Sequence, residues 1–112
     1  MIPHFFVIMM FLPVFGGPVR ITTQAASAEA CQEYVAEAVK SLRRHRYEMS
    51  ACGAGAGEDG MIKEATRLVI VDADRAGRRV IVTVELTSAE SCQRARRVAV
   101  RLSSAAAVIS EC

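Results

Sequence analysis

The stretch TRLVIVDADRAGRRVIVTVELT, residues 66–87, predicts local structure more strongly than any other part of the sequence. β-branched residues dominate both arms, and the centre, Asp74-Arg75-Ala76-Gly77, has Asp first and Gly fourth, as is typical of a type I turn. Gly77 also suits the left-handed position of a three-residue hairpin loop. We therefore expect a β-hairpin.

The turn also predicts which residues face each other across the hairpin. If Asp74 pairs with Arg78, one face becomes strongly apolar, with the pairs Thr66–Leu86, Leu68–Val84, Ile70–Val82 and Asp72–Val80. Arg67 then faces Glu85, an opposite-charge pair that a shift of one residue would destroy. The second face carries Val69, Val71 and Ile81 and suits edge pairing, so self-association through the hairpin is a further expectation.

A helix is predicted before the hairpin, over residues 30–49. Apolar residues recur at helical spacing from Cys31 to Leu42, and His45 continues this apolar seam, which places it facing inward. Acidic residues cluster at the start and arginines at the end, as the helix dipole favours. GAGAGEDG then opens a flexible, glycine-rich loop predicted over residues 53–64.

A second helix is predicted after the hairpin, over residues 88–108. Thr87 and Glu90 have the spacing of a capping box, and small apolar residues then recur every three or four positions. The alternative is a third strand around residues 96–103, because apolar residues alternate there with Arg97, Ala99 and Arg101.

The first 28 residues are predicted to be a signal peptide. Residues 5–15 form an apolar run that is too short to span a bilayer, which takes about 20 residues, and Ala26-Ser27-Ala28 fits the signal peptidase pattern. The segment before the run departs from the pattern, since it has no Lys or Arg. Cleavage would leave 112 − 28 = 84 residues without a stable membrane span, residues 29–112, secreted or periplasmic.

Four cysteines lie in this mature part, and an even number in an oxidising compartment predicts two disulfides. Cysteines about twenty residues apart on one straight helix would lie roughly 30 Å from each other, too far to pair. In a helix–strand–strand–helix order in which each element reverses direction, the two helices run antiparallel, which brings Cys31 near Cys112 and Cys52 near Cys92. We therefore predict these two pairs. The expected fold is a small two-layer α+β domain, helix–β-hairpin–helix (αββα), in which each disulfide joins one end of the first helical segment to one end of the second.

Candidate functional residues are few. Removal of Arg20 leaves thirteen basic against twelve acidic residues, a net charge of +1, so binding of a polyanion would depend on local groups of arginines. The candidate binding residues are Arg43, Arg44, Arg46, Arg94, Arg97 and Arg101. Nucleic acid is not expected as a partner because Tyr34 and Tyr47 are the only mature aromatic residues. No cofactor or metal is expected, as no Cys-x-x-Cys motif occurs.

These observations favour an exported, non-enzymatic module that binds a partner protein or an anionic envelope component. One alternative is a small secreted hydrolase that uses His45 and Asp72. Another is a structural protein of the envelope.

Two hexapeptides, SAEACQ at residues 27–32 and SAESCQ at residues 88–93, share five of six letters. Both are expected near the start of a helix. Similarity elsewhere in the sequence is too weak to indicate a duplication.

Overall fold

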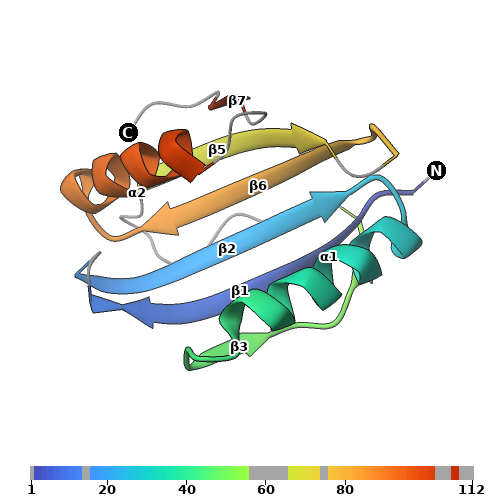
Figure 1. The fold of residues 1–112 in the computed structure, drawn as a ribbon, viewed down its shortest axis with the longest axis horizontal. Coiled ribbons are helices and arrows are strands. Elements are labelled where there is room, and N and C mark those ends of the chain that lie inside the picture. Colours follow the sequence, from blue (N-terminus) through green and yellow to red (C-terminus); the bar gives the residue numbers. More distant parts are fainter. Residues whose placement is uncertain (1, 14–15, 56–65, 74–75, 103–106, 109–112) are drawn as a thin grey trace.

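An antiparallel β-sheet dominates the chain, and both helices pack on the same face of it (Figure 1). The computed structural model describes residues 2–13, 16–55, 66–73, 76–102 and 107–108, with side chains described up to residue 98. The strand order in this part is β3-β1-β2-β6-β5-β7, and β4 also pairs with β1. The elements are β1 His4–Leu12, β2 Gly17–Ala25, α1 Ala28–Leu42, β3 Tyr47–Met49, β4 Gly53–Ala54, β5 Thr66–Ala73, β6 Arg79–Leu86, α2 Ala89–Leu102 and β7 Ala107–Val108.

The predicted hairpin is confirmed as β5 and β6. Its register is the expected one, from Thr66 opposite Leu86 to Asp72 opposite Val80, with Arg67 opposite Glu85. Gly77 has a φ of +79°, the left-handed conformation predicted for it. The predicted pairing of Asp74 lies outside the described residues.

The expected helix–β-hairpin–helix fold is wrong because the sheet is larger than one hairpin. Residues 4–12 and 17–25, predicted to belong to a signal peptide, form β1 and β2 and pair along their whole length from His4–Ala25 to Leu12–Gly17. β2 also pairs with β6 and so joins the two hairpins. An apolar run that would serve as the core of a signal peptide also suits a strand, and in β1 Phe6, Ile8 and Met10 face the core. Cleavage after Ala28 remains a prediction, and it would remove both strands.

The first helix is shorter than predicted. It begins at an N-cap, where the amide of Ala30 donates to Ser27 Oγ at 3.2 Å, and it ends at Leu42. The chain then reverses, and Tyr47–Met49 returns along β1 as the strand β3. Ser50 extends this edge, because its amide donates to the Val7 carbonyl and its hydroxyl accepts from the Val7 amide.

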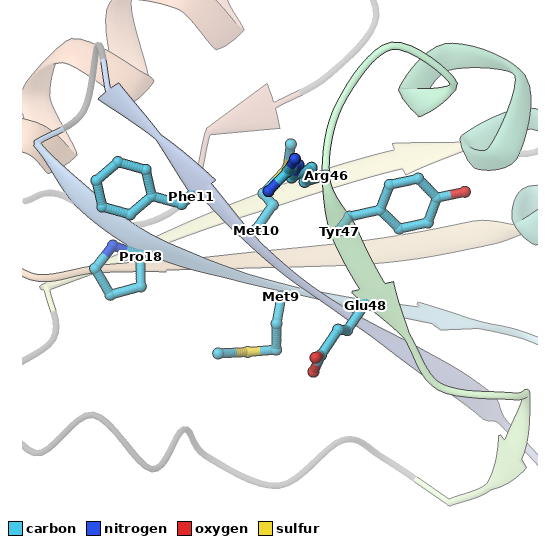
Figure 2. Close-up of a pocket in the computed structure, with 7 residues that line it drawn as sticks. All are labelled: Met9, Met10, Phe11, Pro18, Arg46, Tyr47 and Glu48. Atoms are coloured by element: carbon cyan, nitrogen blue, oxygen red, sulfur yellow. The ribbon is translucent and has the colours of Figure 1, made fainter.

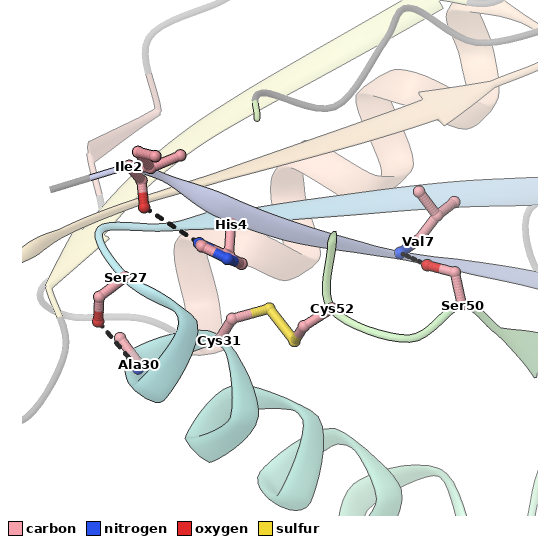
Figure 3. The surroundings of a disulfide bond; sticks show 8 residues. All are labelled: Ile2, His4, Val7, Ser27, Ala30, Cys31, Ser50 and Cys52. Atoms are coloured by element: carbon pink, nitrogen blue, oxygen red, sulfur yellow. Dashed lines mark hydrogen bonds between the residues drawn. A yellow bond between two sulfur atoms is a disulfide. The ribbon is translucent and has the colours of Figure 1, made fainter. Parts of the chain in front are cut away.

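This reversal explains the disulfide, which joins Cys31 to Cys52 (Figure 3). Cys31 lies in the first turn of α1, and the segment after β3 carries Cys52 back to within 6.2 Å, Cα to Cα. The predicted pairs Cys31–Cys112 and Cys52–Cys92 are therefore wrong, since both assumed a helix that continues to about residue 49. Cys92 is also disulfide-bonded, whereas Cys112 lies outside the described residues.

The second helix is confirmed as Ala89–Leu102, so the alternative strand around residues 96–103 is wrong. Its predicted end at residue 108 is wrong too, because Ala107–Val108 form the strand β7. Its N-terminal hydroxyl comes from Ser88, whose Oγ accepts from the amide of Ser91 at 3.1 Å, and not from Thr87 as predicted. Of the predicted glycine-rich loop, Gly53–Ala54 forms β4 and residues 56–64 lie outside the described residues.

The two halves of the chain repeat one ββαβ unit. β1, β2, α1 and β3 correspond in order to β5, β6, α2 and β7. An offset of 61 positions relates Ser27 to Ser88 and Cys31 to Cys92, and it also relates the left-handed glycines Gly16 and Gly77. The same offset relates Thr22 to Thr83, which face each other where β2 meets β6. The hexapeptides thus mark equivalent helix starts about a pseudo-two-fold axis.

The core lies between the sheet and the helices. Its residues from the sheet include Phe6, Ile8, Met10, Val19, Leu68 and Leu86, and those from the helices are Ala30, Cys31, Cys92 and Ala95. Tyr34 on α1 reaches across to the other repeat, where its hydroxyl donates to the carbonyl of Ala73 at 3.4 Å. Arg78 likewise donates to Ser27 Oγ, so contacts between the repeats fix their arrangement.

Candidate binding site

The arginines predicted to bind a partner lie in two separate groups. Arg43 is the C-cap of α1, and Arg44 and Arg46 follow it toward β3; all three are exposed. Arg94 and Arg97 are exposed on α2. The helices run in opposite directions (Figure 1), so the end of α1 lies at the same end of the sheet as the start of α2. The later turns of α2 lead away from that end of the sheet, so the two groups of arginines do not form one basic surface.

Two members of the α2 group have further constraints. Arg94 Nη2 donates to Glu90 Oε1 at 2.7 Å, an ion pair one helical turn apart. Arg101 belongs to α2, but its side chain lies outside the described residues. Of the two groups, only Arg43, Arg44 and Arg46 have all of their side chains described and exposed.

His45 and Asp72, the predicted pair of a small hydrolase, are far apart. His45 is exposed just before β3, so the prediction that it faces inward is wrong: α1 ends before it. Asp72 lies on β5, four strand spacings from β3 in the sheet, roughly 19 Å at about 4.8 Å each. Asp72 Oδ1 accepts a hydrogen bond from the Ala73 amide at 2.8 Å. The two side chains therefore do not form a catalytic dyad.

A small apolar hollow lies where β3 joins β1 (Figure 2). Its volume is about 250 Å³. Its walls come from the ends of β1, β2 and β3 and the residue before β3: Met9, Met10, Phe11, Pro18, Arg46, Tyr47 and Glu48. Phe11 is 64% exposed, the most exposed aromatic ring among the described residues. The hollow is smaller than the pockets of about 300–1,000 Å³ that hold small molecules, so its size suits one or two side chains of a partner.

The register of β3 places charge around this hollow. Tyr47 is opposite Met10 and Glu48 is opposite Met9, so consecutive residues of β3 project from opposite faces of the sheet. Figure 2 shows Met9 and Glu48 projecting to the same side. Arg46 and Glu48 therefore supply both signs of charge beside an apolar floor.

A second polar feature lies at the centre of the sheet, where β2 meets β6. Glu85 is 2% exposed, and Arg20 Nη1 lies 4.0 Å from its Oε1. Arg20 and Glu85 are cross-strand neighbours, and Arg67 lies opposite Glu85 on the other side. A carboxylate that is buried needs a charged or hydrogen-bonding neighbour, and Arg20 places a positive charge beside Glu85 at the junction between the two repeats.

No metal-binding cluster of three His, Cys, Asp or Glu residues occurs in the described ranges. Neither described helix has the length and apolar character needed to cross a bilayer.

No protein family, curated protein or solved structure matches this chain.

Sequence reasoning found Arg46 but missed the other residues of the hollow. Met9, Phe11 and Pro18 were assigned to the signal peptide, and Tyr47 and Glu48 to the end of a helix. One available signal was the offset of 61 positions: applied to β6, it predicts a strand over residues 18–25. A strand there would have suggested that the apolar run before it is its partner.

Proposed function

We propose that this protein is a non-enzymatic module that binds a partner protein through the hollow at the end of β1. The observation that carries this proposal is the exposed ring of Phe11 beside Met9 and Pro18, with Arg46 and Glu48 next to them. Exposed aromatic and arginine side chains around an apolar centre are enriched where proteins meet.

We also propose that the module acts in an oxidising compartment, secreted or periplasmic. The Cys31–Cys52 disulfide supports this, because such bonds persist mainly outside the reducing cytosol. The hollow uses residues 9–11 and Pro18, so binding requires that these residues stay in the folded chain.

A selection experiment tests the binding site. Peptides displayed on phage are selected against the oxidised full chain, and the affinity of the enriched peptides is measured by titration calorimetry. We expect peptides with an apolar anchor whose binding falls at least tenfold in the Phe11→Ser variant.

The matched control is Val98→Ser, which removes an apolar side chain of 43% exposure from α2, away from the hollow. This variant should bind the peptides as the parent chain does. Peptides that bind the parent and Phe11→Ser equally would show that the hollow is not the site.

The arginines after α1 support a second candidate, binding of an anionic envelope component. Arg43, Arg44 and Arg46 are all exposed within four residues. Reversal of these three charges to Glu should abolish salt-dependent retention on a sulfated resin, whereas reversal of Arg97 alone should change it little. Retention that is unaffected by the triple reversal would exclude this candidate.

A further inference from the structure

β3 is the outer strand on its side of the sheet. The Ser50 amide donates inward to the Val7 carbonyl, and successive backbone groups of a strand point to alternate sides. Glu48 therefore also points its backbone groups toward β1, and Tyr47 and Met49 point theirs outward. No described strand pairs with this outer edge, which leaves it open to β-strand addition.

The side chains around Tyr47 are charged in a self-complementary order. When two copies of this edge pair antiparallel about a two-fold axis at Tyr47, Arg46 of each copy faces Glu48 of the other. The same axis placed one residue later would set Glu48 against Glu48, which is unfavourable. Charge therefore selects one register of self-pairing.

The backbone geometry fits the same register. With the axis at Tyr47, the outward amide and carbonyl of each Tyr47 bond to those of the other. Met49 then pairs with His45, whose amide already donates to the Leu42 carbonyl at 2.8 Å but whose carbonyl can still accept. Arg46 and Glu48 fall at positions without backbone bonds, where cross-strand side chains come closest.

We propose that the partner at the hollow is a second copy of this chain, paired through β3 to form a symmetric dimer with one continuous sheet. Each Arg46–Glu48 ion pair would lie beside a hollow, because Glu48 and Met9 share a face of the sheet. This inference rests on the proposed function, since it names the occupant of the same site.

Charge-swapped variants test the dimer by light scattering after size exclusion and by sedimentation, with the oxidised full chain. The parent should be dimeric. Arg46→Glu and Glu48→Arg should each weaken the dimer at least tenfold, because each sets like charges against one another across the axis. An equimolar mixture of the two variants should form a heterodimer, since every cross-axis pair then carries opposite charges.

Three results would overturn the inference: a parent that stays monomeric, single variants that dimerise as well as the parent, or a mixture that behaves as its separate components. Circular dichroism of each variant establishes that it remains folded. If the parent is monomeric and yet binds selected peptides in a manner that depends on Phe11, the binding function stands and only the second copy is excluded. If neither dimer nor peptide binding depends on the hollow, both proposals fail.

Discussion

Removal of residues 1–28 is the most informative perturbation of this chain. In the structure, these residues supply four large side chains of the core, Phe6, Ile8, Met10 and Val19. Burial of a side chain of this kind contributes about 1.5–3 kcal/mol, so their loss costs about 6–12 kcal/mol as an upper bound. A whole domain is stable by only about 5–15 kcal/mol. The chain that begins at residue 29 is therefore expected not to fold on its own.

The assay compares the full chain with residues 29–112, both oxidised, in urea denaturation followed by circular dichroism. We expect a cooperative transition for the full chain alone. Amino-terminal sequencing of the protein recovered from its native compartment shows which form exists there. A mature protein that starts at Glu29 and unfolds cooperatively would refute the reasoning and support the signal peptide.

Point substitutions in β1 test the same reasoning without truncation. Phe6 is 2% exposed and Phe11 is 64% exposed, on the same strand and on opposite faces. Phe6→Ala should lower the free energy of unfolding by about 3–5 kcal/mol, and Phe11→Ala by less than about 1 kcal/mol. Equal and negligible effects would show that residues 4–12 are not part of the folded sheet.

Three further predictions concern the loop closures and caps. The double substitution of Cys31 and Cys52 to Ser should lower the free energy of unfolding by about 3 kcal/mol, because the disulfide links residues that are 21 apart in the sequence. Peptide mapping of the parent chain should recover Cys31 joined to Cys52, and another pairing would contradict the fold. Ser88→Ala should cost about 1 kcal/mol in the same urea assay, since Ser88 Oγ caps α2, and an unchanged midpoint would argue against that cap. Gly77→Ala should cost about 1 kcal/mol because its φ is +79° although no atom crowds it, whereas Gly53→Ala, equally uncrowded and without a positive φ, should change stability little.

The hairpin of β5 and β6 was predictable in detail because its information is local. Asp74 and Gly77 predict a turn in the sequence, and the turn predicts the register. The observed pairing, with Arg67 opposite Glu85, agrees with that register. The helix start near Cys92 was predictable for the same reason, since a hydroxyl and a run of helical spacing are enough to begin a helix.

The candidate site could not be predicted in this way. The hollow joins residue 11 to residues 46–48, which pairing of β1 with β3 brings together across more than thirty positions of sequence. The prediction of the disulfide pairing was wrong for a related reason. The helical period up to Leu42 does not say where the chain turns back, and that turn alone brings Cys52 to Cys31.

SAEACQ and SAESCQ illustrate what the local sequence determines and what only the tertiary structure decides. Composition and spacing alone were enough to place a helix near each hexapeptide and a hairpin before the second one, because caps, turns and apolar periods act over a few residues. An equivalent hairpin, β1 and β2, precedes the first hexapeptide. It becomes evident only in the tertiary structure, where β2 pairs with β6. The apolar run of residues 5–15 has the composition of a signal peptide core and also that of a strand. Only the tertiary structure places residues 4–12 in the sheet, where they pair with residues 17–25.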